Sequence, residues 1–331
     1  MKFFLSISLV ASCMLYGMDN QTIDIIQTYR TKGIEATKSM LENYLTQKDF
    51  WMGVLQNKDT DYGYYESVNF IFVADKSIPD LALYENDNGV LTKINQTNAL
   101  VGSGKGNKKV EGDLTTPIGV YDITARLSGL NQYYGPLALV TSYPNTYDKI
   151  RKKTGYGIWI HGLPLSGNRK ELNTKGCIAV ENNTLSQYDK TIGNKKAILI
   201  SYEQNFKPAT KEELATILSD LYKWRDSWIK NDLQDYLSFY GNDFVRYDGM
   251  KINAFKDYKK RVFDKKEEKT ILFSNINISP YPNEEGKNIF KISFSQDYSA
   301  FKNNKITYTS NSTKELYVSL VDGKMSILTE K

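Results

Sequence analysis

The most informative part of the chain reads Gly157-Ile158-Trp159-Ile160-His161-Gly162 and, a little further on, Thr174-Lys175-Gly176-Cys177-Ile178-Ala179-Val180. The apolar residues of the first run predict a β-strand that ends at His161. His161 is the only histidine among 331 residues, and Cys177 is one of two cysteines. Each has a glycine beside it, which allows unusual backbone dihedral angles and a close approach to a bound molecule. The pattern predicts a site formed by these two side chains.

Cysteine and histidine in this arrangement suit nucleophilic catalysis. A cysteine attacks as a thiolate, which needs a base, and the oxyanion that follows needs backbone N–H donors. The alternative is a buried structural cysteine with a surface histidine. The scarcity of both residues and the neighbouring glycines favour catalysis by Cys177 and His161.

The N-terminus resembles a secretory signal. Lys2 precedes an apolar run over 3–15, which is too short to span a bilayer. We expect a signal peptide at 1–17 and a periplasmic protein; lipidation of Cys13 is the second possibility, and a buried N-terminal helix the third. Without the signal, Cys177 is a lone thiol in an exported protein, where cysteines are usually paired or absent.

Composition narrows the class of protein further. Lys and Arg exceed Asp and Glu by only five, 43 against 38, so we expect no nucleic-acid partner. No later run reaches the roughly 20 apolar residues of a membrane helix. The length suggests two domains, with a small third.

The hydrophobic pattern changes along the chain. Residues 18–64 read as a helical segment that Gly33 breaks or bends, and it is too small for a core of its own. It is therefore expected to pack on the next domain or on a second copy of the chain as a homodimer. From 65 to 203 short apolar runs with turn residues predict a mainly β domain. These runs are 68–74, 80–85, 119–124, 137–141, 157–161 and 197–202.

A linker is expected at 206–210, and an α+β domain over 204–331. Thr210 and Glu213 form a capping box before a helix whose apolar face includes Trp224 and Trp228. A short helix at 232–240 and strands follow, at 271–278, 289–298, 314–321 and 325–328.

The motifs resemble the L,D-transpeptidase (YkuD-type) catalytic domain. His161-Gly162 and Gly176-Cys177, thirteen residues apart, are similar to that family's His-Gly and Ser-His-Gly-Cys-Ile-Arg signature. The run 112–121 is similar to its Lys-Thr-Pro-x-Gly-x-Tyr segment, and 73–84 to its opening hairpin. The resemblance covers about 70–202 and implies a β-sandwich-like fold. It also implies action on peptidoglycan stem peptides through a cysteine thioester.

The resemblance assigns roles by position. Cys177 is the nucleophile and His161 the general base, oriented by a backbone carbonyl. Gly176 and Cys177 supply oxyanion N–H groups, and Gly162 shapes the wall beside the base. Candidates for substrate contacts are Trp159, Thr174, Lys175 and Tyr156. No metal or other cofactor is implied, because one histidine and one cysteine cannot complete a zinc site.

Two positions depart from the family's pattern. Lys175 stands where the second histidine is usual, and Ala179 where an arginine is usual. Without that arginine we expect water rather than an amine to accept the acyl group. Lys175 either binds a stem-peptide carboxylate or is simply solvated. The glycine-rich run 102–106 lacks P-loop spacing and is expected to form a turn near the active-site face.

In the C-terminal part, the runs 221–228, 232–240, 243–244 and 294–298 resemble domains similar to nuclear transport factor 2, which have a curved sheet around a pocket. The combination is similar to the cell-shape L,D-carboxypeptidases of helical Gram-negative bacteria, which trim tetrapeptide stems to tripeptides. The pocket is expected to bind glycan or peptide, although Trp224, Trp228 and Tyr236 are each more typical of a core. The alternatives are a transpeptidase that forms diaminopimelate cross-links, a wall-binding module, and an enzyme that releases a wall-tethered protein.

Overall fold

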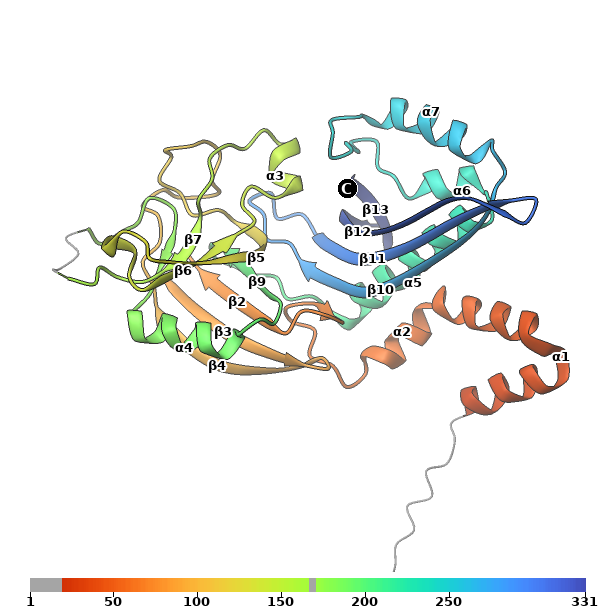
Figure 1. Cartoon of the computed structure of the whole chain (residues 1–331), viewed down its shortest axis with the longest axis horizontal. Helices are drawn as coiled ribbons and strands as arrows, with labels where there is room; N and C mark the ends of the chain where they lie inside the picture. The colour runs from red at the N-terminus through yellow and green to blue at the C-terminus, as the bar shows by residue number, and fades with distance from the viewer. Residues whose placement is uncertain (1–19, 167–170) are drawn as a thin grey trace, which may run out of the picture. The chain divides into compact units, whose positions relative to one another are not determined.

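The structure, a computed structural model, describes residues 20–166 and 171–331 (Figure 1). The expected signal peptide and Cys13 lie outside the described residues. The chain divides into two compact units, up to Gln47 and from Lys48 to Lys331. In the described part, no helix has the length and apolar character that a membrane crossing requires.

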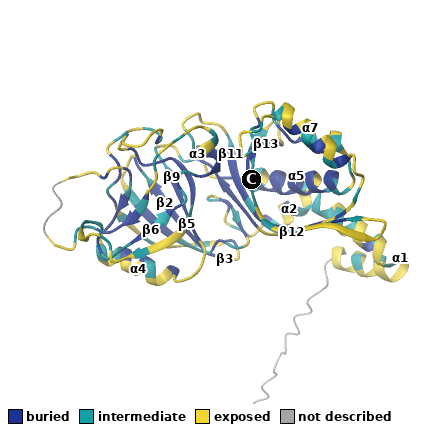
Figure 2. Cartoon of the chain, turned by 45° about the horizontal axis from the view of Figure 1, so that its top comes forward, coloured by how far each residue is buried: buried dark blue, intermediate teal, exposed yellow. Residues whose placement is uncertain are grey.

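The first unit contains α1 (Asn20–Leu45), which is interrupted at Gly33. Gly33 has φ 80° and ψ −175°, which is not helical and is accessible mainly to glycine. The predicted break is therefore confirmed. Ile26, Tyr29 and Ile34 are exposed on this helix (Figure 2).

The second unit begins with α2 (Lys48–Leu55) and contains two β-sheets. The larger sheet has eight strands in the order β4-β3-β2-β9-β5-β6-β7-β8. Their bounds are β2 (Phe70–Asp75), β3 (Asp80–Asp87), β4 (Val90–Asn98), β5 (Gly119–Ser128), β6 (Leu137–Thr141), β7 (Trp159–His161), β8 (Ile178–Ala179) and β9 (Ala197–Tyr202). The predicted mainly β domain is confirmed. Asn88 and Gly89, both with positive φ, form the β3–β4 turn expected from the sequence.

Helices cover this sheet where the sequence suggested few. They are α3 (Thr146–Ile150) and α4 (Asn182–Ile192), with a 3₁₀ turn at Gln132–Tyr134. Leu185, Tyr188 and Ile192 of α4 join a buried core that includes Phe72. The Tyr188 and Phe72 rings meet edge to face at 5.5 Å.

The smaller sheet has five strands in the order β1-β10-β11-β12-β13. Its elements are β1 (Tyr64–Tyr65), β10 (Glu268–Pro280), β11 (Ile289–Lys302), β12 (Lys305–Val321) and β13 (Lys324–Glu330), with α5 (Lys211–Ile229), α6 (Leu233–Ser238) and α7 (Ile252–Phe263). The α5 helix is largely buried (Figure 2). Its capping box is confirmed, because the Thr210 hydroxyl accepts from the Glu213 N–H and the Glu213 carboxylate accepts from the Thr210 N–H.

The two sheets share a buried core. Ile71 and Ile200 of the larger sheet belong to one apolar cluster with Ile289 and Tyr317 of the smaller one. A buried lysine, Lys291 on β11, joins the two sheets as well. Its Nζ lies 2.6 Å from Asp122 Oδ2 on β5 and 3.4 Å from Glu315 Oε2 on β12. The unit from Lys48 onward is therefore one packed body.

Candidate active site

The pairing of β7 with β8 brings the two predicted catalytic residues to one face of the sheet. The strands are parallel, with Ile160 opposite Ile178 and His161 opposite Ala179. Ile160 and Ile178 both point into the core beneath the sheet. Since side chains alternate along a strand, His161 and Cys177 lie on the opposite face, on neighbouring segments.

His161 is held in one orientation. Its side chain is 2% exposed, and its Nδ1 lies 2.7 Å from the backbone oxygen of Gly162. The Tyr134 ring packs edge-on against the imidazole, with ring centroids 5.1 Å apart. A carbonyl oxygen only accepts, so Nδ1 carries the proton in this bond and Nε2 is left as the basic nitrogen. The orienting group is a backbone carbonyl.

Cys177 is partly exposed, and its thiol donates to the Gly157 carbonyl at 3.4 Å. Thr174 organises the turn before it: the Thr174 hydroxyl donates to Cys177 O at 2.6 Å and accepts from Gly176 N at 3.1 Å. Thr174 is itself buried, and its own N–H donates to Val101 O. The N–H of Gly176, expected to face an oxyanion, therefore has a partner inside the turn.

Gly176 approaches another loop too closely for any side chain. It has φ +127°, and a Cβ there would stand 2.9 Å from Thr115 O.

The loop that contains Thr115 is organised by Asp113, whose carboxylate accepts from Lys108 Nζ at 2.7 Å. Burial opposes ionisation of Asp113. Its hydrogen bonds outweigh that effect and lower its pKa to about 2; the donors are the Lys108 side chain and the backbone N–H groups of Lys109, Thr115 and Val110.

The remaining predicted residues surround this turn. Trp159 is half-buried, with its ring 5.3 Å from that of Tyr134. Tyr156 is 79% exposed, and Lys175 is exposed as well. Gly162 donates its N–H to Tyr134 O and approaches Asn182 so closely that a Cβ would lie 2.1 Å from Asn182 Oδ1. These residues are available to a substrate or shape its surroundings.

Ala179 occupies a closed position. It is 1% exposed, and it exchanges both backbone hydrogen bonds with Leu100 at 2.8 Å. The adjoining glycine-rich run lies beside the same turn, since Gly102 forms a β-bridge with Thr174. A Cβ on Gly102 would stand 2.2 Å from Leu114 O, so close packing explains the glycine.

Sequence reasoning missed Tyr134, Gly157 and Asp113 at this site. None of them belongs to the His-Gly or Gly-Cys motif, and each reaches the site through folding. The nearest signal was the family-like run 112–121, which contains Asp113.

A cavity of about 530 Å³ lies in the C-terminal domain. Lys259 lines it, 4.0 Å from Glu330 Oε1, and burial lowers the pKa of Lys259 to about 8 despite the carboxylate. Trp228 and Gln296 also line it, and the buried atoms Trp228 Nε1 and Gln296 Oε1 make no hydrogen bond within residues 20–166 and 171–331. Unsatisfied buried polar atoms beside a tuned lysine are typical of a binding pocket. Trp224 and Tyr236 are core residues, 1% and 0% exposed.

Comparison with known proteins identifies both domains. The L,D-transpeptidase catalytic domain (YkuD) model matches residues 69–199, and the Cds6 C-terminal NTF2-like domain model matches residues 216–331. No curated protein sequence gives a significant match.

Solved structures cover most of the chain. The helical cell shape determining protein Pgp2 from Campylobacter jejuni is 40% identical, with TM-score 0.80 over 86% of this chain and 99% of that one. A variant of the same protein gives TM-score 0.81 over 87% and 99%. Bd1075 from Bdellovibrio bacteriovorus shares the fold at 23% identity, with TM-score 0.63 over 82% of this chain and 95% of that one. The chain therefore belongs to the family of Pgp2, with a YkuD-type L,D-transpeptidase catalytic domain followed by an NTF2-like domain.

Proposed function

We propose that this protein is a peptidoglycan L,D-carboxypeptidase that removes the terminal D-Ala from tetrapeptide stems and so contributes to cell shape. Its relative Pgp2 is described as a helical cell shape determining protein. The observation that supports the proposal is the parallel β7–β8 pairing, with His161 opposite Ala179, because Cys177 directly precedes β8 and so lies on the segment next to β7.

The reaction follows from the two side chains. His161 Nε2 takes the thiol proton, and the Cys177 sulfur attacks the carbonyl carbon at the L-centre of diaminopimelate. When the tetrahedral intermediate collapses, the C–N bond breaks and His161 returns the proton to the nitrogen of D-Ala, leaving a thioester. Water then gives a proton to His161 and its oxygen attacks the thioester. The C–S bond breaks, and His161 returns the proton to the sulfur.

The oxyanion formed in each step needs N–H donors. The Cys177 N–H, at the nucleophile itself, is our first assignment. The Gly176 N–H can contribute only by leaving the Thr174 hydroxyl.

Water is our choice of acceptor because of Ala179. The arginine usual in the family is replaced by a buried residue whose backbone is fully paired with Leu100. No guanidinium extends from this position to help hold an acceptor peptide, so water competes more effectively for the thioester.

The test is incubation with a disaccharide-tetrapeptide and resolution of the products by mass. We expect a disaccharide-tripeptide and one D-Ala, with no dimer. Cys177→Ala should abolish release while the circular dichroism spectrum stays unchanged, and His161→Ala should come close to it, because a nucleophile and its base act as one unit. Full activity in a folded, pure Cys177→Ala protein would end the proposal.

Other products would identify the alternatives. Diaminopimelate cross-linked dimers would show a transpeptidase. Binding to sacculi without any product would favour a wall-binding module, and liberation of a wall-tethered protein would show that the thioester serves another substrate.

Three further features belong to this proposal. The C-terminal cavity beside Lys259 binds a peptide or glycan part of the wall polymer. The protein is periplasmic, exported by the signal at 1–17 or anchored through Cys13. Exposed apolar residues on α1, such as Ile26 and Ile34, support a homodimer through this segment, which light scattering at two protein concentrations would test.

A further inference from the structure

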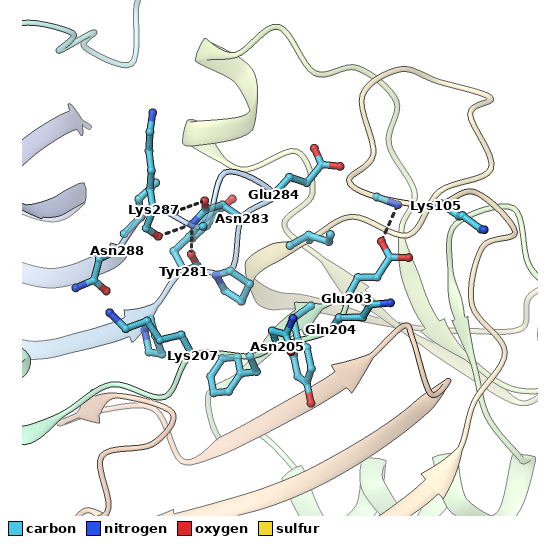
Figure 3. A pocket seen from close by; sticks show the side chains of 18 residues that line it. Lys105, Glu203, Gln204, Asn205, Lys207, Tyr281, Asn283, Glu284, Lys287 and Asn288 are labelled. Atoms are coloured by element: carbon cyan, nitrogen blue, oxygen red, sulfur yellow. Dashed lines mark hydrogen bonds between the residues drawn. The ribbon is translucent and has the colours of Figure 1, made fainter.

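A cavity of about 430 Å³ lies at the junction of the two sheets, and its lining includes neither His161 nor Cys177 (Figure 3). It is lined by the turn after β9, Glu203 to Lys207, and by the β10–β11 loop, Pro280 to Ile289. A neighbouring cavity of about 410 Å³ shares Lys287 and Asn288 of that loop and extends to Arg151. Such volumes fit ligands of oligosaccharide or drug size.

Two lysines of this junction cavity are paired with carboxylates. Lys207 Nζ lies 3.0 Å from Glu213 Oε1, and Lys287 Nζ lies 2.5 Å from Glu285 Oε2. In Figure 3 the Lys105 side chain runs away from the labelled amides. An anionic ligand would have to compete with these carboxylates.

Its carboxylates are engaged as well. Glu203 Oε2 accepts from Gly106 N at 2.6 Å and lies 3.5 Å from Lys76 Nζ. Glu284 Oε1 accepts from Asn107 N at 2.6 Å. With two of the lysines and both carboxylates already engaged, few charged groups remain for an ionic ligand, and the junction cavity suits a neutral one.

The polar groups that remain are mostly amides. Gln204 and Asn205 line the cavity (Figure 3), and so does Asn288, whose amide nitrogen donates to Glu213 Oε1 at 2.7 Å and whose amide oxygen is the acceptor that remains. The half-buried Tyr202 and Phe206 belong to the same lining. A side-chain amide offers both donors and an acceptor, which matches hydroxyl and acetamido groups. Apolar ring surfaces suit the C–H faces of sugar rings.

The wall of the cavity is preorganised. Asn283 donates to Tyr281 O at 3.1 Å and Lys287 O at 2.8 Å, and it accepts from Lys287 N at 3.0 Å. Gln204 and Asn205 are held with φ of 60° and 46°. A loop fixed before binding loses less entropy when a ligand arrives.

The junction cavity is connected to the catalytic turn by one short loop. Gly106 lines the cavity, while Gly102 at the start of the loop bridges to Thr174. Thr174 in turn holds the Cys177 carbonyl.

We propose that the junction cavity binds a neutral N-acetylhexosamine oligosaccharide, the glycan strand of peptidoglycan, on the same protein whose Cys177 processes the stem peptide. The choice of this glycan rests on the proposed function, whereas the match to a neutral, acetamido-bearing sugar rests on the lining alone.

The test is the binding of peptide-free tetra-N-acetylchitotetraose to the full chain, measured by calorimetry. Asn205→Gly removes one amide without straining a residue at φ 46°. Loss of its hydrogen bonds should weaken binding about tenfold, the equivalent of about 1.4 kcal/mol. Gln204→Gly, at φ 60°, is a second variant of the same kind. The matched control is Asn303→Gly in the exposed β11–β12 turn, at φ 52°, which should bind like the wild type.

The outcomes separate this proposal from the enzymatic one. Wild-type protein that releases D-Ala but binds no oligosaccharide overturns the glycan proposal alone. Lys314 lines the C-terminal cavity. Binding that is insensitive to Asn205→Gly and Gln204→Gly, yet lost in Lys314→Ala, overturns the proposal in favour of that cavity. Binding that depends on Asn205, in a protein that releases no D-Ala, supports the glycan site and contradicts the proposed reaction.

Discussion

At the scale of single residues, Thr174 fixes the catalytic turn. Its hydroxyl is the donor to the Cys177 carbonyl and the acceptor for the Gly176 N–H. A hydroxyl so engaged at a buried position acts on the backbone of Cys177 and Gly176, whereas the sequence suggested that it contacts substrate.

Thr174→Val should lower kcat with little change in KM. Both hydrogen bonds are lost, which costs about 1–3 kcal/mol and corresponds to about 5–160-fold in rate if the loss falls on the transition state. Thr174→Ser should restore most of the activity, and Thr124→Val, at an exposed hydroxyl on β5, is the control. A raised KM with unchanged kcat would instead show that Thr174 binds substrate.

How far the sequence predicts this site depends on the kind of residue. His161 and Cys177 stood out because each is scarce and lies beside glycine. Tyr134 could not be found in this way, because it reaches His161 only through the packing of the 3₁₀ turn. The partner of the Gly176 N–H was also hidden, since it depends on the rotamer of Thr174.

At the scale of elements, Asp113 organises the loop that lies against Gly176. The folded state holds the pKa of Asp113 at about 2, below the ordinary value of 3.8. The unfolded chain binds the proton more readily, so this carboxylate stabilises the fold above about pH 4. That stability is lost as the pH falls through about 2.

Asp113→Asn should therefore lower the melting temperature at pH 6, and the difference from wild type should shrink between about pH 4 and pH 2. Thermal melts of both proteins across this range are the measurement. A difference that stays constant down to pH 2 would show that the hydrogen-bond pattern of the amide, and not ionisation, is responsible.

In the C-terminal cavity the charge of a buried lysine, Lys259, destabilises the fold, whereas the charge of Asp113 stabilises it. Burial lowers the pKa of Lys259 to about 8 from 10.5, with Glu330 acting against burial and Lys314 and Arg246 adding to it. Below about pH 8 the folded state bears the cost of this buried charge. As the pH rises from about 8 towards 10.5, the folded state loses the proton first and stability increases.

Lys259→Met should therefore raise the free energy of unfolding at pH 7 by an amount on the order of 3 kcal/mol, and with it the melting temperature. This gain should decline above about pH 8. Lys256→Met, on the same helix but exposed, is the control. A destabilised Lys259→Met protein at pH 7 would show that the ion pair with Glu330 outweighs burial.

Elements with a strong local signal were the predictable ones. The capping box at Thr210 and the turn at Asn88-Gly89 are encoded by a few adjacent residues. The α4 helix was not expected, because only Leu185, Tyr188 and Ile192 of its eleven residues are buried and the rest are mostly polar. Its helical form depends on the core that it covers.

At the scale of the whole molecule, the catalytic and NTF2-like domains share a core and the buried Lys291 cluster. Asp122 and Glu315 raise the pKa of Lys291 although burial opposes them, so the lysine stays charged between the sheets. The sequence predicted a linker at 206–210. In the structure, Phe206 of this segment packs against Tyr62 and Tyr202. The local sequence pattern does not predict these contacts.

Calorimetric unfolding of the unit from Lys48 onward, followed in the full chain, should give a single transition for both domains. Lys291→Ala should lower its midpoint, since it leaves the carboxylates of Asp122 and Glu315 without their shared cation. Lys302→Ala, exposed at the end of β11, should have little effect. Two well-separated wild-type transitions would mean that the shared core does not couple the domains.

The central claim is that water resolves a Cys177 thioester. The most direct measurement is digestion of the disaccharide-tetrapeptide in water enriched in heavy oxygen, with mass analysis of the peptide product. We predict a tripeptide that carries one heavy oxygen atom in its new carboxylate. With Cys177→Ala we predict that no tripeptide forms. Cross-linked dimers without the label would contradict the account, because an amine would then be the acceptor.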